Sequence, residues 1–298
     1  MQSLKFFALK ILVFASFFSL KAQEKPVKII SEKLTEDVYM LTGQGGNIGI
    51  YIGPDNIFMI DDQFSHLSDQ IKETIKTLSP KPISVLFNTH MHGDHTGGNA
   101  NFNTDEITLI SQDNARKRVQ ENNLKKLNSQ EIDSVYYNKM LPEITFSNDL
   151  TLNKGKETIL AFHVHKAHTD GDAMVYFAQN NVLHMGDTYF SEGYPFIDLK
   201  SGGSVNGYID AHKKALVLID NETKIIPGHG KSSTKKELET YVLMLEDIKE
   251  NVLKAITSGA TLKEVETDTT ISKKYDANYG GGFISPERLR VTFYTSLK

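Results

Sequence analysis

The sequence predicts an α/β (α+β) protein in which two β-sheets are covered by helices on their outer faces. Strand-like segments come first and helices follow them, and this order occurs twice along the chain. No repeat, low-complexity block or Pro/Ser-rich linker divides the two blocks. Because a sheet that is apolar on one face must bury that face against another layer, this order favours a layered sandwich in a single domain.

The first block opens with short apolar segments separated by turns. Glycine, proline and asparagine gather at residues 45–47 and 54–56, as is typical of turns between strands. Helices and strands then alternate. We expect strands at 38–41, 48–52, 57–60, 83–87 and 107–110, and helices at 66–78 and 112–127.

The second block repeats this organisation and ends in a long helix. We expect strands at 158–165, 173–177, 182–185 and 224–226, with a helix at 205–219. The last helix is predicted from apolar residues at helical spacing, which form one buried face. These residues are Leu238, Tyr241, Val242, Leu245, Ile248 and Val252.

The first 22 residues have the features of a secretory signal peptide. Lys5 and Lys10 provide a positive start, residues 11–20 are almost wholly apolar, and Ala22 is a small residue suited to cleavage. The apolar run is too short to form a stable membrane anchor. We therefore expect residues 23–298 to form one mature domain that is periplasmic or secreted.

Composition narrows the kinds of site that the chain can build. The 298 residues include no cysteine, which excludes disulfides and cysteine-ligated metals, so a metal site must use His and carboxylate groups. The net charge is −4 and no basic cluster is present, which argues against a nucleic-acid partner. A small-molecule substrate is the partner that remains, and the sequence does not indicate an oligomeric state.

The motif at residues 90–95, His-Met-His-Gly-Asp-His, directly follows the expected strand 83–87. In an extended chain, side chains at positions i and i+2 point the same way, ~6.6 Å apart, so His90 and His92 could bind one ion. Gly93 allows a sharp turn, which directs Asp94 and His95 toward a second point. One short loop could therefore serve two adjacent metals.

Three further polar side chains follow expected strands. His168 lies in Ala-His-Thr-Asp-Gly-Asp, Asp187 follows strand 182–185, and His229 lies in Pro-Gly-His-Gly after strand 224–226. Functional side chains are commonly carried by loops at strand ends. The remaining histidines, which lack carboxylate neighbours or lie inside expected elements, are predicted to stay outside the site; these are His66, His163, His165, His184 and His212.

This ordered set of motifs resembles the metallo-β-lactamase superfamily of hydrolases. The resemblance implies a four-layer αββα sandwich with a binuclear metal site at one edge. It implies that Asp187 bridges the two ions. It implies a first site of His90, His92 and His168, and a second of Asp94, His95 and His229.

The resemblance also implies the cofactors and the chemistry. Two Zn²⁺ ions suit these ligands, although Fe or Mn could occupy the oxygen-richer second site. Two such ions hold a hydroxide at neutral pH and polarise the bond that it attacks, and Asp94 could orient that hydroxide. Asp61, which ends a strand, matches an acid that holds a ligand histidine in one tautomer, although it could also be a simple turn residue.

Two departures from the family pattern bear on the substrate. Asp187 stands where cysteine-bearing β-lactamases have Cys, and Phe190 stands where they have a Lys that binds the substrate carboxylate. We therefore expect weak β-lactamase activity, because a charge-assisted contact is lost. Tyr189 and Tyr194 could donate to an oxyanion or leaving group, or simply form walls of the pocket.

The sequence thus predicts an exported binuclear zinc hydrolase acting on a lactam, lactone, ester or amide. Glutathione thioesters fit Asp187 but belong inside the cell, which conflicts with the signal peptide. The alternative is a non-catalytic metal-binding or ligand-binding protein that retains the site.

Overall fold

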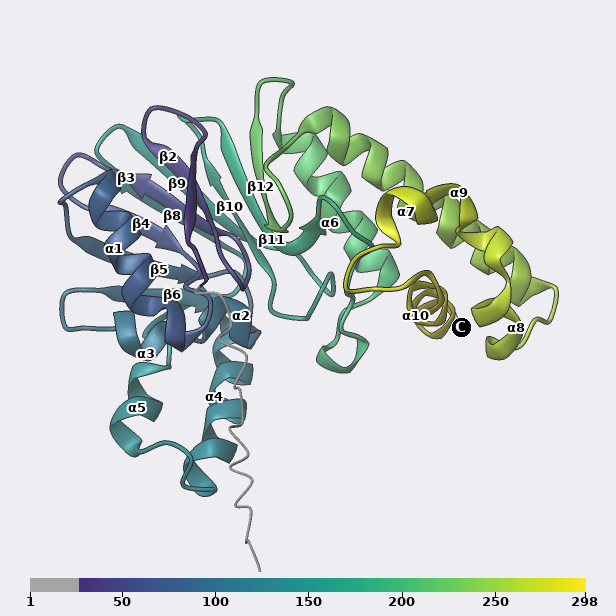
Figure 1. Cartoon of the computed structure of the whole chain (residues 1–298), viewed down its shortest axis with the longest axis horizontal. Coiled ribbons are helices and arrows are strands. Elements are labelled where there is room, and N and C mark those ends of the chain that lie inside the picture. Colours follow the sequence, from purple (N-terminus) through teal and green to yellow (C-terminus); the bar gives the residue numbers. More distant parts are fainter. Residues whose placement is uncertain (1–26) are drawn as a thin grey trace, which may run out of the picture.

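Two β-sheets lie face to face in the computed structural model, which describes residues 27–298 (Figure 1). The first sheet runs in the order β1 (Ile30–Lys33), β2 (Val38–Thr42), β3 (Ile48–Ile52), β4 (Ile57–Ile60), β5 (Ile83–Asn88), β6 (Thr108–Gln112) and β7 (Ile144–Phe146). The second runs in the order β13 (Ser233–Thr234), β12 (Lys224–His229), β11 (Val182–Phe190), β10 (Ala173–Phe177), β9 (Glu157–His163) and β8 (Asp149–Lys154).

Side chains that point alternately to the two faces of each strand divide the core into layers. In β4, Phe58 and Ile60 pack between the two sheets, whereas Ile57 and Met59 pack on the other face against α1 (Ser68–Leu78). Successive side chains of a strand point to opposite faces, so a strand that is apolar throughout must be covered on both sides. This pattern explains why β4 is fully buried.

Helices cover both outer faces and complete the four-layer αββα arrangement that was predicted. On the second sheet, α6 (Val205–Leu218) and α7 (Lys235–Thr257) bury their apolar faces against strands β9 to β12. The other helices are η1 (Ser65–Leu67), α2 (Gly93–Thr96), α3 (Asn99–Phe102), α4 (Asp113–Asn128), α5 (Ser134–Lys139), η2 (Leu199–Ser201), α8 (Leu262–Thr267), η3 (Thr269–Ile271), α9 (Lys273–Tyr279) and α10 (Pro286–Leu297).

The helices α8, α9 and α10 were not anticipated from the sequence. They lie beside α7 at the end of the molecule that is yellow in Figure 1. Arg290 of α10 is buried there and donates to the carbonyl oxygen of Glu266 and to Ser272 Oγ. Because a buried guanidinium needs such acceptors, these contacts fix the position of α10.

Strand β11 is longer than the segment 182–185 that was expected. It continues past Gly186, where the backbone turns with φ 51° and the parallel pairing with β12 changes register. Glycine adopts this left-handed conformation without steric cost, so the strand re-aims the residues that follow. Asp187 is thereby directed to the edge between the sheets.

The predicted signal peptide lies within residues 1–26 and therefore outside the described residues. Among residues 27–298, none of the helices is both long enough and apolar enough to cross a bilayer. The assignment of residues 23–298 to one domain stays a prediction.

Candidate metal centre

Loops from both sheets meet at one edge of the sandwich and bring the predicted ligands together. The motif at 90–95 follows β5 of the first sheet and runs into α2. His168 lies between β9 and β10, Asp187 lies within β11, and His229 ends β12, all in the second sheet. The site is therefore shared between the two halves of the sandwich.

Four side chains of the first group converge on one point. His92 Nδ1 lies 3.2 Å from His90 Nε2 and 2.8 Å from His168 Nε2. Asp187 Oδ2 lies 3.7 Å from His90 Nε2 and 3.5 Å from His168 Nε2. One potential ligand atom from each residue lies within 4.8 Å of all the others, so the four could hold one ion.

Asp94, His95 and His229 form a second group beside the first. Asp94 Oδ2 lies 3.8 Å from His95 Nε2 and 3.3 Å from His229 Nε2. Asp187 presents its other oxygen here, with Oδ1 3.0 Å from His95 Nε2 and 3.3 Å from His229 Nε2. One oxygen of Asp187 therefore faces each group, which is the arrangement that the predicted bridging role requires.

The ring nitrogens that point away from the centre bind outer partners. Metal-bound histidines usually use their second nitrogen in this way, because the contact fixes the tautomer and the ring orientation. The pairs are His90 Nδ1 with Thr89 Oγ1 at 3.0 Å, His92 Nε2 with Asp198 Oδ2 at 3.2 Å, His95 Nδ1 with Asp61 Oδ2 at 2.7 Å, and His168 Nδ1 with the Phe196 carbonyl oxygen at 2.7 Å.

Asp61 lies where the sequence placed it, immediately after β4, and is fully buried. Its carboxylate accepts hydrogen bonds from Thr89 N and Thr89 Oγ1, both at 2.8 Å, and contacts His95. Its backbone is left-handed, with φ 62°. A non-glycine residue in this conformation costs of order 1–3 kcal/mol and is found mainly at functional sites. These contacts suit the predicted orienting role.

Asp198 was missed by sequence reasoning. It lies before η2, far along the chain from His92, and its carboxylate also accepts from the backbone nitrogens of Lys200 and Ser201. No nearby histidine or strand end marks it in the sequence. Only the folded loop brings it to the ligand set.

The protonation of the metal-free residues tests whether they suit a metal. Burial lowers the pKa of His90 well below its ordinary value, and burial lowers the pKa of His168 to about 4, so both rings are neutral with a lone pair available. Burial would raise the pKa of Asp187, but His95 and His229 outweigh it and hold that pKa well below its usual range. His90 and His168 are thus in the form that binds metal. Burial would lower the pKa values of His95 and His229, but Asp187 outweighs it and raises the pKa of His95 well above its ordinary value and that of His229 to about 9, so a metal bound beside them would displace their protons.

Two buried atoms at the centre lack a hydrogen-bond partner. His95 Nε2 and Asp187 Oδ1 lie 3.0 Å apart, but neither has a partner in hydrogen-bonding geometry among the described residues. Orphaned buried polar atoms are rare in folded proteins and call for a missing partner, such as an ion. The residues present therefore fit a metal.

The two tyrosines do not fit an oxyanion-donor role. Tyr189 is packed against Tyr241 and its hydroxyl lies 2.9 Å from Ser233 Oγ, away from the cavity beside the predicted ligands. Tyr194 does line that cavity, but its hydroxyl donates to Asp276 Oδ1 at 2.7 Å. Both hydroxyls are therefore committed to other contacts, that of Tyr189 in β13 and that of Tyr194 in α9.

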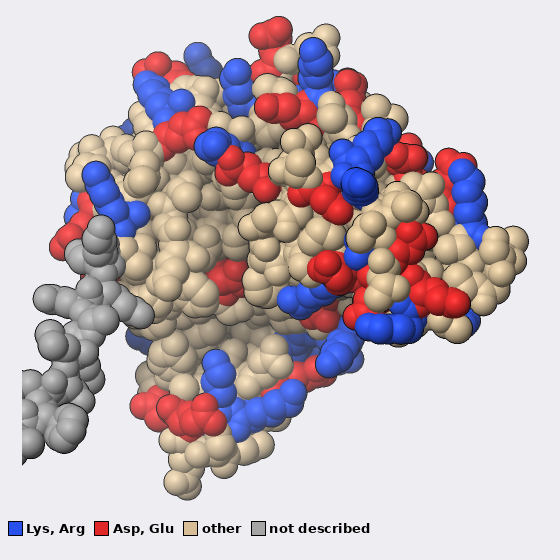
Figure 2. Space-filling view, turned by 45° about the vertical axis from the view of Figure 1, so that its right-hand side comes forward, with Lys and Arg blue, Asp and Glu red and all other residues tan. Residues whose placement is uncertain are grey.

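A cavity of about 610 Å³ opens beside the two groups and is mainly apolar. Figure 2 shows this face of the molecule hollowed, with uncharged side chains over most of the hollow and an acidic group at its base. Phe190 stacks on the His229 ring, with centroids 5.1 Å apart. The other side chains that form the walls are Phe64, Tyr194, Phe196, Phe283 and Glu192.

A family model described as the metallo-beta-lactamase superfamily matches residues 53–229, which is more than half of the chain. The chain belongs to the metallo-beta-lactamase superfamily. The family prediction is therefore confirmed. The matched span reaches from β4 to His229 and so includes every predicted metal ligand.

Individual relatives are distant. A hydroxyacylglutathione hydrolase of Nitrosococcus oceani is 28% identical over 149 residues, covering 49% of this chain and 48% of that protein. The chain thus matches about half the length of this relative.

Several solved structures share the fold at low sequence identity. The DIM-1 metallo-beta-lactamase has a TM-score of 0.57 and 19% identity, covering 74% of this chain and 99% of that one. A metallo-beta-lactamase from Pontibacter korlensis has a TM-score of 0.59 and 16% identity, covering 74% and 100%. The stereoselective inverting sec-alkylsulfatase Pisa1 from Pseudomonas sp. has a TM-score of 0.73 and 13% identity, covering 90% and 50%.

Proposed function

We propose that this member of the superfamily is an exported binuclear zinc hydrolase that cleaves a carbonyl bond in a lactone, ester, amide or lactam. The observation that carries the proposal is the placement of Asp187, whose two oxygens face two separate groups of potential ligands. Two ions bound there would supply an activated water at neutral pH and polarise the carbonyl group. A shared carboxylate supports the short spacing that such a pair needs.

Asp94 is the residue best placed to move a proton. Its side chain is 29% exposed and lines the cavity, so one oxygen can face a water molecule there while the other stays near His229. Burial would raise its pKa, but His95 and His229 outweigh that effect and lower it. The carboxylate is therefore ionised at neutral pH, as a group that accepts a proton must be.

The cavity walls favour an apolar substrate body and exclude water from the reacting bond. Phe64, Phe190 and Phe196 present ring surface, and burying an apolar group against them is favourable by roughly 25 cal/mol per Å². We expect weak β-lactamase activity, because Phe190 offers no charge to a carboxylate next to the scissile bond.

The proposal is tested by measuring substrate hydrolysis and metal content on the same sample. The purified mature chain is assayed on chromogenic esters, lactones and a cephalosporin, with metal measured in parallel. We expect hydrolysis that chelation abolishes and zinc restores, with esters or lactones preferred to the cephalosporin. Bound metal without turnover on any substrate would favour the non-catalytic binding protein instead.

Export needs a separate test. We propose that the chain is cut after Ala22, so the mature protein begins at Gln23. N-terminal sequencing of the protein recovered outside the cytoplasm would identify the cut. A chain that keeps Met1 and stays inside the cell would contradict export.

A further inference from the structure

Arg288 of α10 packs on two aromatic rings at the cavity. Its guanidinium carbon lies 5.3 Å from the Phe196 ring centroid and 4.9 Å from that of Phe283. The two rings meet edge to face, with centroids 5.9 Å apart, and both line the cavity. We call these three residues the Arg288 cluster. A guanidinium held over two rings is oriented by cation–π attraction and so loses less freedom when it binds a ligand.

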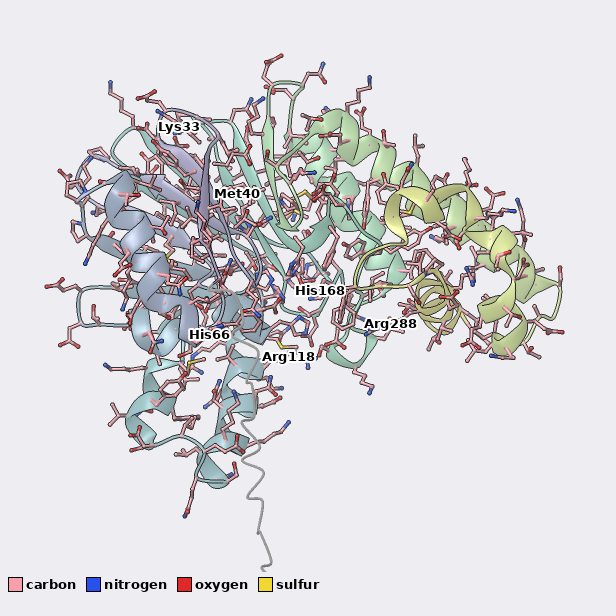
Figure 3. All side chains as sticks on the ribbon, viewed as in Figure 1. Lys33, Met40, His66, Arg118, His168 and Arg288 are labelled. Carbon is pink, nitrogen blue, oxygen red and sulfur yellow. The ribbon has the colours of Figure 1, made fainter. Side chains whose placement is uncertain are left out.

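The cluster adjoins the predicted ligands through Phe196. The Phe196 ring stacks on His92, with centroids 5.8 Å apart, and lies 5.5 Å from the His168 ring. Its carbonyl oxygen binds His168 Nδ1. Phe196 therefore contacts both Arg288 and the candidate metal centre. Arg288 and His168 are labelled near each other in Figure 3.

The Arg288 guanidinium has no hydrogen bond or carboxylate partner among residues 27–298, although it is exposed beside Phe196 and Phe283, which line the cavity. The other three arginines are all engaged. Arg116 donates to Pro142, Arg118 binds both oxygens of Asp170, and Arg290 binds Glu266 and Ser272. A planar guanidinium that is oriented but unpaired is suited to bind a carboxylate through two hydrogen bonds.

We propose that Arg288 recognises a carboxylate on the substrate, and that the substrate is an apolar acyl compound whose carboxylate lies remote from the scissile carbonyl. This inference rests on the proposed hydrolase function. The remoteness follows from Phe196, whose ring separates Arg288 from His92 and His168. A β-lactam carries its carboxylate next to the reacting ring, so it would not reach both points.

Other charges at the cavity permit an anion to bind. Glu192 lines the same cavity, but Lys231 pairs with it at 2.5 Å and offsets its charge. Phe190 and Tyr194 continue the apolar wall toward the centre. The other two carboxylates that line the cavity, Asp94 and Asp187, belong to the candidate metal centre. The cavity therefore offers an apolar path from that centre to the Phe196 and Phe283 wall on which Arg288 packs.

A matched pair of esters tests the proposal on the zinc-loaded mature chain, residues 23–298. The probes are 4-nitrophenyl hexanoate, which is neutral, and the mono-4-nitrophenyl ester of adipic acid, which adds a terminal carboxylate. Arg288→Met keeps an unbranched side chain on the rings and removes the charge. We expect it to lower kcat/KM for the adipate ester about tenfold and to change that for hexanoate less than about twofold.

Two further variants control for general charge effects. Lys274→Met removes an exposed cation in α9 that pairs with Asp247, and should leave both esters unchanged. Arg288→Lys keeps the charge and should recover part of the loss. Equal changes for the two esters with Arg288→Met, or an equal loss with Lys274→Met, would overturn the proposal.

A binding measurement separates this proposal from the hydrolase proposal. Calorimetry compares 4-phenylbutyrate with its neutral amide on the wild-type chain and on Arg288→Met. If Arg288→Met weakens binding of the acid and not of the amide, Arg288 recognises the carboxylate. This result would support the inference even if no ester is cleaved, in which case only the proposed hydrolase function fails. Unchanged binding, or no preference for the acid in the wild type, would show that Arg288 does not recognise a carboxylate.

Discussion

Replacing Asp61 by Asn would test how the outer contacts of the centre control metal affinity. The change keeps the size of the side chain and an oxygen for Thr89 N. It places an amide against His95 Nδ1, where a carboxylate oxygen now accepts at 2.7 Å. An amide hydrogen there favours the tautomer of His95 whose proton is on Nε2, the atom that faces Asp187 and the second group.

The expected magnitude follows from that one contact. A hydrogen bond to a charged group contributes about 1.5–3 kcal/mol, which corresponds to roughly 10- to 150-fold in affinity. This range agrees with the loss of roughly 10–100-fold in metal affinity that commonly follows when an outer partner of a metal ligand is replaced. At the proposed binuclear zinc centre, we therefore expect the affinity for one ion to fall about 10- to 100-fold and the affinity for the other to change little.

Competition with a chromophoric chelator measures the two affinities. The matched control is Asp62→Asn, the next residue, whose buried carboxyl accepts from Gly98 N and has its pKa raised well above the ordinary value by burial. Among residues 27–298 the Asp62 side chain makes no hydrogen bond to a predicted metal ligand, and Asn keeps an oxygen for Gly98 N, so this change should leave both affinities within about twofold. Unchanged affinities in Asp61→Asn, or an equal loss in Asp62→Asn, would refute the reasoning.

Two further changes test contacts made by the C-terminal helices. Tyr194→Phe removes the hydrogen bond to Asp276, so it should lower the free energy of unfolding by about 1.5–3 kcal/mol, measured by thermal unfolding. The kcat should stay within about twofold, whereas a fall of about 100-fold would restore an oxyanion-donor role for Tyr194. Arg290→Ala leaves the Glu266 carbonyl oxygen without its donor and should lower the free energy of unfolding by about 3 kcal/mol, measured by urea unfolding. A loss below about 0.5 kcal/mol would mean that α10 is held by apolar packing alone.

The parts of the fold that were predicted are those with a local signal. Strands at 48–52, 57–60 and 173–177 begin and end where the sequence placed them, because each is a continuous apolar run closed by turn residues. The edge strand β8 alternates between exposed and half-buried residues and carries no such run. Helices α8 and α9 are only six and seven residues long, shorter than the window of roughly 11–18 residues over which helical apolar spacing can be recognised.

The candidate site also contains residues with a local sequence signal and residues without one. The metal-capable residues follow strands and carry distinctive side chains, so the sequence alone could group them, and the structure brings all seven together. Asp198 and Arg288 had no such signal, because each reaches the site only through the folding of a distant segment. Tyr189 lies only two residues after Asp187 in sequence, but β11 directs its side chain into the layer covered by α7.

The division of the ligands between the two sheets has a consequence for how the protein matures. Each of the two groups of potential ligands takes residues from the segment after β5 and from the second sheet, so neither group is complete until both sheets have formed and met. Tight metal uptake must therefore follow the docking of the two halves, so the ion would enter at the end of folding. Once bound, it would act as a cross-link between segments distant in sequence, and its binding free energy would add to the stability of the native state.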